Sequence, residues 1–279
     1  MTARKRHGAS LCSGPWCPDN GVMADFFDTH AHLDFPDFAA DLDAVVERAQ
    51  LAGITRVVCI GTTLAGSRRV VELAARFPSV YAVVGVHPNH AHEEPENIVP
   101  ELTELVRQPK VVGIGETGLD RYWDRAPFDM QEDYFRRHLE FCRSRQLPVI
   151  IHCREAEADV VRMLREQFDQ HGPIAGLMHS FAGDAPTATS CLEMGLHISF
   201  SGMITFPKSD ALREAAQVVP MDRLLVETDA PYLAPQAVRG KRNEPAFVVE
   251  TDRHRQPRDR SNDIIFEFLV KRPRSKHRQ

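Results

Sequence analysis

Six residues of the types that bind metal ions or transfer protons stand at the ends of short apolar runs in this chain. His30 and His32 are separated by one residue, so in an extended strand both imidazoles point to the same side. The other four end four further runs and are Glu116, His152, His179 and Asp229. Imidazoles and carboxylates bind divalent cations, and a carboxylate beside an activated water can take its proton.

Taken singly, each of these residues has an ordinary structural explanation. A lone histidine in an apolar run is most often a hydrogen-bonded core residue, and Asp229 before Ala-Pro could cap a turn. Taken together they indicate a shared cation, because buried imidazoles and carboxylates without partners would cost several kcal/mol each. The set suffices for two divalent cations (Mg²⁺, Mn²⁺ or Zn²⁺) about 3.5–4 Å apart. Glu116 is placed to bridge them, and Asp229 to ligate metal and accept the water's proton.

Eight apolar, β-branched runs alternate with stretches of helical periodicity along the chain. The expected strands are 26–30, 56–61, 81–87, 111–116, 148–152, 174–179, 197–201 and 224–229. The expected helices are 42–52, 67–77, 98–106, 130–145, 158–168, 188–194 and 211–218. Strands that alternate with helices indicate a parallel sheet, and eight such units favour an α/β fold closed as a (β/α)8 TIM-type barrel. In such a barrel the carboxyl ends of all strands meet at one rim, where active sites lie.

The ends of the chain depart from the barrel pattern. We expect 1–22, which is polar and basic without the apolar stretch of a signal peptide, to be a disordered N-terminal extension, and 23–249 to be the barrel. We expect 250–279 to be a divergent basic tail in place of the last helix, because it contains Pro257 and has an apolar patch only at 264–270.

Composition limits the classes of protein that need to be considered. With 279 residues the chain has room for one barrel of roughly 250 residues and little more. A net charge of −5 does not suggest a general nucleic-acid coat protein, though it permits an enzyme that holds phosphates through metal and a few arginines. The six cysteines form no paired C-x-x-C pattern, and no run approaches the ~18 apolar residues of a membrane span. We expect a cytoplasmic protein with reduced thiols, no membrane contact and no obligate protein partner.

Seven short motifs carry a resemblance to a known family. They are Asp28-Thr-His-Ala-His-Leu-Asp, Gly85-Val-His-Pro, Gly113-Ile-Gly-Glu-Thr-Gly-Leu-Asp, Ile151-His-Cys-Arg-Glu-Ala, Met178-His-Ser-Phe, Glu227-Thr-Asp-Ala-Pro-Tyr-Leu and Arg239-Gly-Lys-Arg-Asn-Glu-Pro. From residue 27 to about 249 the sequence resembles the TatD-type metal-dependent deoxyribonucleases of the amidohydrolase superfamily. The resemblance implies a divalent-cation-dependent DNase, often exonucleolytic. It also implies that the metal ligands are His30, His32, Glu116, His152, His179 and Asp229.

Further residues near the expected rim could contact the substrate. His87 ends the third expected strand, and Arg154 follows His152 by two residues, so either could bind a phosphate, although a structural role is about as common. Lys241 and Arg242 lie in the loop after the last strand, where they could also hold a phosphate.

Three other positions have roles that the sequence leaves open. Asp28 shares the parity of His30 and could orient a ligand imidazole. Asp120 is better explained as a carboxylate that stabilises its loop than as a ligand. The aromatic pair Tyr122 and Trp123 could stack an unpaired base, although loop-packing aromatics are commoner.

Three functions compete. The first is hydrolysis of DNA phosphodiester bonds, and the second is hydrolysis of an amide or ester, such as a cyclic amide or an aminoacyl-tRNA bond. A basic open groove would favour the first and a closed apolar pocket the second. The third is an inactive protein that binds nucleic acid through its basic tail, and the complete set of ligand-type residues argues against it.

Overall fold

The computed structural model describes residues 26–123 and 125–253 and contains one sheet of eight strands in sequence order. All neighbouring strands pair in parallel. The strands are β1 (Phe26–Ala31), β2 (Ile54–Ile60), β3 (Val80–Val84), β4 (Val111–Asp120), β5 (Val149–Arg154), β6 (Gly176–Met178), β7 (His197–Phe200) and β8 (Leu224–Val226). This architecture is the TIM-type barrel that the alternating pattern predicts.

The last strand returns to the first and closes the sheet. The backbone N–H of Asp229 donates to the carbonyl of His30 at 2.9 Å, and that of His32 donates to the carbonyl of Ala230 at 2.8 Å. These two bonds continue the ladder beyond β8 through a bridge between Ala31 and Ala230. The closure therefore brings Asp229 beside His30 and His32, about two hundred positions earlier in the chain.

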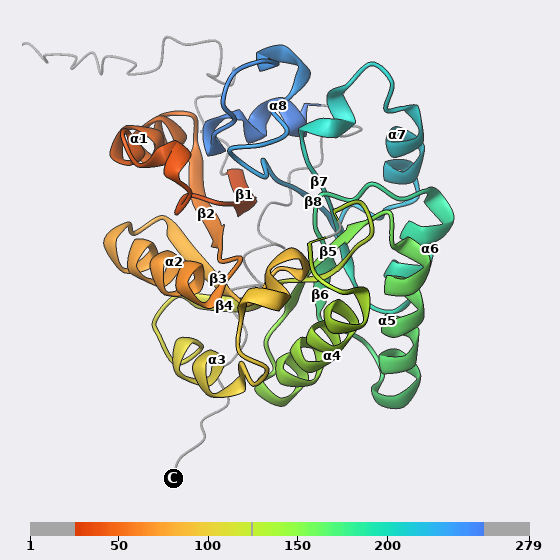
Figure 1. Ribbon diagram of the computed structural model, residues 1–279. Helices are drawn as coiled ribbons and strands as arrows, with labels where there is room; N and C mark the ends of the chain where they lie inside the picture. The colour runs from red at the N-terminus through yellow and green to blue at the C-terminus, as the bar shows by residue number, and fades with distance from the viewer. Residues whose placement is uncertain (1–25, 124, 254–279) are drawn as a thin grey trace, which may run out of the picture.

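Helices follow the strands and surround the barrel (Figure 1). They are α1 (Leu42–Leu51), α2 (Leu64–Arg76), α3 (Val99–Leu105), α4 (Phe128–Arg145), α5 (Glu157–His171), α6 (Ala185–Glu193), α7 (Asp210–Gln217) and α8 (Val248–Asp252). Helix α2 begins three residues before its expected start, because the Thr63 side chain accepts the N–H of Gly66 and caps the first turn. Helix α5 ends at His171, beyond its expected end at 168, and Gly172 follows it with φ 80°.

Strand β4 runs four residues past its expected end at Glu116. Its extension pairs with β5, with Gly118 opposite His152 and Asp120 opposite Arg154. Gly118 has φ 139°, and a Cβ there would lie 2.0 Å from the carbonyl oxygen of His152, so only glycine permits this close pairing. The extension carries Asp120 up to the rim.

An apolar layer fills the barrel beneath the rim. It consists of buried side chains from seven strands, namely Phe27, Val58, Ile60, Val83, Val112, Ile150, Leu177 and Leu225. A larger apolar cluster packs the strands against the outer helices. The polar rim residues therefore rest on a layer that excludes water from below.

The predicted tail boundary at Val249 falls inside α8. Val248, Val249 and Thr251 of this short helix are all buried, and the helix lies beside β1 and β8. The interpretations of 1–22 and of nearly all of 250–279 lie outside the described residues. Across the residues that are described, no helix is long and apolar enough to cross a membrane.

Candidate metal centre

The first cluster at the rim joins the end of β1 to the loop after β8. The Nε2 atoms of His30 and His32 face each other at 3.2 Å. Oδ1 of Asp229 lies 3.7 Å from the first of these nitrogens and 3.4 Å from the second. The three ligand atoms lie within 4.8 Å of one another, close enough to hold one metal ion.

The second cluster lies on the other side of Glu116. Oε1 of this carboxylate is 2.7 Å from Nε2 of His179 and 2.9 Å from Nδ1 of His152. The two ring nitrogens are 3.4 Å apart. His152 belongs to β5 and His179 directly follows β6, so three strands supply this cluster.

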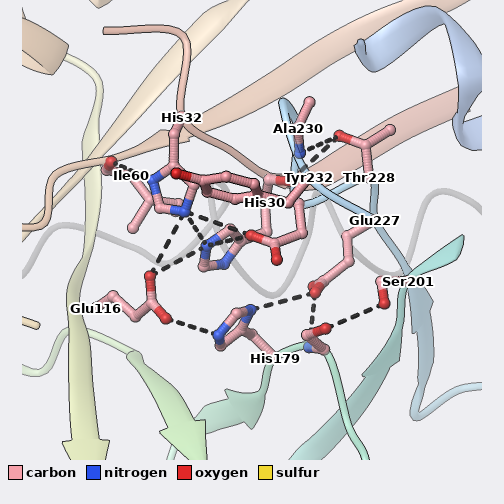
Figure 2. A network of polar contacts seen from close by, with 12 residues as sticks. His30, His32, Ile60, Glu116, His179, Ser201, Glu227, Thr228, Ala230 and Tyr232 are labelled. Carbon is pink, nitrogen blue, oxygen red and sulfur yellow. Dashed lines mark hydrogen bonds and ion pairs between the residues drawn. The ribbon is translucent and has the colours of Figure 1, made fainter. Parts of the chain in front are cut away.

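Glu116 connects the two clusters. While Oε1 faces His152 and His179, Oε2 lies 3.3 Å from Nε2 of His30 and 3.7 Å from Nε2 of His32. Figure 2 shows the carboxylate between the His30–His32 pair and His179. One buried carboxylate thus presents a different oxygen to each group of imidazoles, which is the arrangement expected of a bridging ligand.

The clusters fit a divalent cation chemically. Nε2 of His30 and Nε2 of His32 are too close for two uncompensated lone pairs in a buried place, and Nδ1 of His30 has no hydrogen-bond partner among the described residues. Burial alone would raise the pKa of Glu116, but the electrostatic effects of His179, His87 and His30 outweigh burial and hold that pKa well below its usual value. A fixed negative charge among nitrogen donors suits Zn²⁺, Mn²⁺ or Fe²⁺, and the carboxylates also suit Mg²⁺.

Outer partners hold three of the imidazoles in orientation. Nδ1 of His32 lies 3.1 Å from the carbonyl of Ile60, so it carries the proton and leaves Nε2 free as a ligand. Nδ1 of His179 lies 3.2 Å from Oε1 of Glu227, and Nε2 of His152 lies 3.0 Å from Oδ2 of Asp120. Each of these contacts turns the opposite ring nitrogen toward the centre.

Sequence reasoning missed Glu227. Its buried carboxylate accepts the backbone N–H of Ser180 at 2.6 Å as well as the His179 ring. Glu227 stands two residues before Asp229, the same spacing that singled out His30 and His32, so the signal was present. The expected last strand extends to Asp229 and so places Glu227 inside the strand. In the structure β8 ends at Val226, and Glu227 is the first residue after it.

Asp28 differs from its expected role of orienting an imidazole. Its carboxylate accepts the N–H and the hydroxyl of Thr228 at 2.9 and 2.5 Å, and the backbone N–H of His30 at 3.3 Å. Burial raises the pKa of Asp28 to about 8, against the effect of the Thr228 hydrogen bonds. The residue therefore fastens the backbone of β1 to the segment after β8.

A third group of metal-type residues, His87, Asp120 and His152, is better explained by hydrogen bonds than by a cation. Nδ1 of His87 accepts the N–H of Asn89 at 3.0 Å, so a neutral ring carries its proton on Nε2 and cannot ligate there. Oδ2 of Asp120 accepts from the Asn89 amide and from His152, both at 3.0 Å.

The other oxygen of Asp120 holds the loop after β4. Oδ1 accepts the N–H groups of Tyr122 and Trp123, both at 2.9 Å, which agrees with the loop-stabilising role inferred from the sequence. Both oxygens of this carboxylate are therefore occupied by two donors each.

A cavity of about 520 Å³ opens above these clusters. His32, Glu116, His152, His179 and Asp229 line it, as do two of the residues suggested for substrate, His87 and Arg154.

Lys241 and Arg242 are not among the described residues that line this cavity. Arg242 instead forms a paired ion contact with Asp41 at 2.8 and 2.9 Å, and its guanidinium lies 4.6 Å from the centre of the Phe38 ring. It fastens the loop after β8 to the segment before α1.

The fold and the composition of the site are those of a metal-dependent hydrolase. Residues 27–254 match the family described as TatD related DNase, and the chain belongs to this family. The uncharacterized metal-dependent hydrolase YabD of Bacillus subtilis is 40% identical over 222 residues, which cover 80% of this chain and 86% of YabD. The uncharacterized metal-dependent hydrolase TatD of Mycobacterium tuberculosis is 39% identical over 234 residues, covering 81% of this chain and 87% of that protein.

A solved structure shares the same architecture. YjjV, a TatD homologue from Escherichia coli, superposes with a TM-score of 0.79 at 28% identity, over 89% of this chain and 98% of YjjV. The family and its relatives thus support a divalent metal ion at the site and a hydrolytic activity, as the resemblance implied.

Proposed function

We propose that this protein hydrolyses phosphodiester bonds of DNA from a strand end, using two divalent cations (Mg²⁺, Mn²⁺ or Zn²⁺). The observation that carries the proposal is the position of Glu116, with one oxygen toward each cluster of imidazoles. One cation would be held by His30, His32 and Asp229, the other by His152 and His179, and Glu116 would serve both. Cations in these places would supply Lewis-acid activation of a water molecule and of the phosphoryl group.

The remaining chemistry belongs to side chains of the chain itself. Asp229 is partly open to the cavity, with 13% of its side chain exposed. Burial alone would raise its pKa, but the hydrogen bond to His32 and the charges of His30 and His179 outweigh burial and lower it. The carboxylate is therefore ionised at neutral pH and takes a proton from the attacking water. As the new oxygen–phosphorus bond forms, the bond from phosphorus to the leaving sugar oxygen breaks.

Two cavity residues are suited to hold the phosphate. The N–H of Asn89 fixes the proton of a neutral His87 on Nε2, which makes that atom a donor toward a phosphate oxygen. Arg154 also lines the cavity and can donate two parallel hydrogen bonds to a phosphate. We assign the substrate contacts to His87 and Arg154, because Arg242 is engaged by Asp41.

A cleavage assay with end-labelled DNA tests the proposal. Single-stranded DNA labelled at either the 5′ or the 3′ end is incubated with chelator-treated protein to which Mg²⁺, Mn²⁺ or Zn²⁺ is returned. Stepwise shortening from one end is expected. RNA of the same sequence, a cyclic amide and p-nitrophenyl acetate are the comparison substrates. Hydrolysis of the amide or ester in place of DNA would favour a carbonyl-directed enzyme and contradict the proposal.

A further inference from the structure

Two exposed aromatic side chains stand beside the cavity, in the loop between β4 and α4. Tyr122 is 49% exposed and Trp123 is 43% exposed. Trp123 lines the cavity together with His152 and Asp229, whereas Tyr122 is not among the described lining residues. An indole ring that is partly open to water beside a cavity presents a flat apolar face on which a ligand can stack.

The loop that carries these rings is tied to the metal-type residues. Oδ1 of Asp120 accepts the backbone N–H groups of Tyr122 and Trp123, and Oδ2 of the same carboxylate lies 3.0 Å from His152. The backbone at Trp123 is therefore set relative to His152 before any substrate binds. A ligand that stacks on Trp123 is held at a defined position relative to the reacting phosphate.

Two arginines accompany the aromatic pair. The guanidinium of Arg154 lies 3.8 Å from the centre of the Tyr122 ring and 5.8 Å from that of Trp123. The guanidinium of Arg125 lies 5.2 Å from the Trp123 ring. Cationic groups interleaved with exposed rings are typical of surfaces that bind single-stranded nucleic acid, where bases stack and phosphates pair with charge.

The two rings are not equivalent. Arg154 covers Tyr122 closely, so Tyr122 is explained by loop packing and by the support it gives to a phosphate-binding arginine. Both arginines lie farther from Trp123, and Trp123 faces the cavity. Of the pair, Trp123 is the ring with a role still unexplained.

We infer that Trp123 stacks the base of the nucleotide next to the scissile phosphate, which makes an unpaired strand end the substrate. This inference rests on the proposed nuclease function. In a duplex both faces of each base are covered by its neighbours, so a ring can stack in this way only on a base released from pairing. Arg154 contacts the backbone of the same nucleotide and does not distinguish among bases.

Fluorescence tests stacking without relying on catalysis. The chain has two tryptophans, Trp16 and Trp123, so Trp16→Phe leaves Trp123 as the sole indole. In an Asp229→Asn background, in which turnover is slow, titration with a short single-stranded oligodeoxythymidylate should quench Trp123 emission. An oligonucleotide with abasic residues near its ends should bind through its phosphates and quench little. Equal quenching by both would overturn the inference.

Substitution of Trp123 provides the quantitative test. Trp123→Leu keeps apolar bulk but removes the π face, so binding of the base-bearing strand should weaken about 5- to 150-fold, which is the loss of one stacked base. Binding of the abasic strand should stay the same, and Trp123→Phe should restore most of the affinity. Arg154→Ala is the matched control and should weaken binding of both strands alike.

The two proposals fail in different ways. If the wild-type protein cleaves no nucleic acid, the proposed function is wrong. If it cleaves DNA and Trp123→Leu binds both strands as the wild type does, the nuclease function stands and the role of Trp123 is wrong.

Discussion

His179 lies against Glu116 with 2.7 Å between Nε2 and Oε1. On the other side of the ring, Nδ1 lies 3.2 Å from Oε1 of Glu227. Burial would lower the pKa of His179, but the charges of Glu116 and Glu227 and the hydrogen bonds to them outweigh burial and raise that pKa well above its usual value. Without metal, a protonated His179 ring balances the negative charges of the carboxylates of Glu116 and Glu227 on its two sides. A metal ion held by Nε2 of His179 would take the place of the proton there, so metal binding should release protons.

Removal of metal should abolish hydrolysis and lower stability. Dialysis against a chelator should remove the activity, and Mg²⁺, Mn²⁺ or Zn²⁺ should restore it. A cation that binds only the folded chain at a concentration 100 times its Kd stabilises by about 2.7 kcal/mol per site, so the melting temperature should rise as metal is returned. The checks are elemental analysis, a nuclease assay and a thermal melt on the same sample. Full activity in a demonstrably metal-free sample would contradict the assignment.

Asp229→Asn should retain much of the metal and lose most of the turnover. The amide keeps a ligand oxygen but cannot accept the proton of the attacking water, so kcat should fall roughly 10²- to 10⁴-fold. Glu116→Gln is the informative comparison, because loss of the carboxylate that faces both clusters should also reduce metal occupancy. A near-normal rate in Asp229→Asn with normal metal content would show that another group is the base.

Glu227→Gln should weaken metal binding although Glu227 is not proposed as a ligand. Its carboxylate fixes the proton on Nδ1 of His179, and loss of such an outer partner typically costs 10- to 100-fold in metal affinity. Competition with a chromophoric chelator measures this affinity. Glu244→Gln is the matched control, because Glu244 pairs with Arg48 outside the cavity and its loss should lower stability only. Equal metal affinity in the wild type and Glu227→Gln would refute the positioning role.

The residues at the rim could be predicted because, in a barrel, any residue at the carboxyl end of a strand lies at the same rim. Every parallel strand presents its carboxyl end to the same rim, so locating the ends of β1, β5 and β6 was enough to group His30, His152 and His179. The grouping required no knowledge of side-chain contacts.

The partners of individual side chains could not be predicted in this way. Arg242 lies in a loop that the family motif marks, yet its guanidinium pairs with Asp41, 201 positions away. Glu227 was missed because β8 ends at Val226, earlier than the apolar run suggests. The contact of Asp120 with His152 was missed because β4 continues past its expected end. The local sequence pattern does not show which charged residue, distant in the sequence, pairs with a given side chain.

Acidification should destabilise the protein through His138. This histidine of α4 is fully buried, and burial lowers its pKa to about 4, with a small opposing effect from its hydrogen bond to the Tyr134 carbonyl. Because the folded-state pKa lies below the unfolded value near 6.5, the unfolded chain binds more protons between these values. Stability is complete above about pH 6.5 and is lost as the pH falls toward 4.

Comparing the wild-type protein with the His138→Gln variant separates the pH-dependent loss of stability due to His138 from that due to other histidines. The amide preserves an acceptor for the N–H of Val86, which His138 accepts at 3.2 Å, but it does not titrate. Between pH 7 and pH 4.5 the wild type should lose about 2–3 kcal/mol more of its free energy of unfolding than the variant. Urea unfolding at the two pH values measures the difference, and parallel losses would show that His138 is not buried as a neutral ring.

The last prediction concerns where the barrel ends. The family match stops at residue 254, and all six proposed metal ligands lie upstream. Helix α8 buries Val248, Val249 and Thr251 beside β1 and β8, where no other helix follows in the described chain. A protein shortened to end at Arg253 should therefore keep its metal content, its specific activity and its melting temperature. One shortened to end at Phe247 loses two buried valines, each contributing roughly 1.5–3 kcal/mol, and should melt several degrees lower.

Binding of single-stranded DNA by the chain ending at Arg253 also tests the alternative in which the basic tail is the binding element. If that chain keeps its metal and activity but loses its affinity for DNA, residues 254–279 contribute the affinity, and the cavity alone does not explain binding.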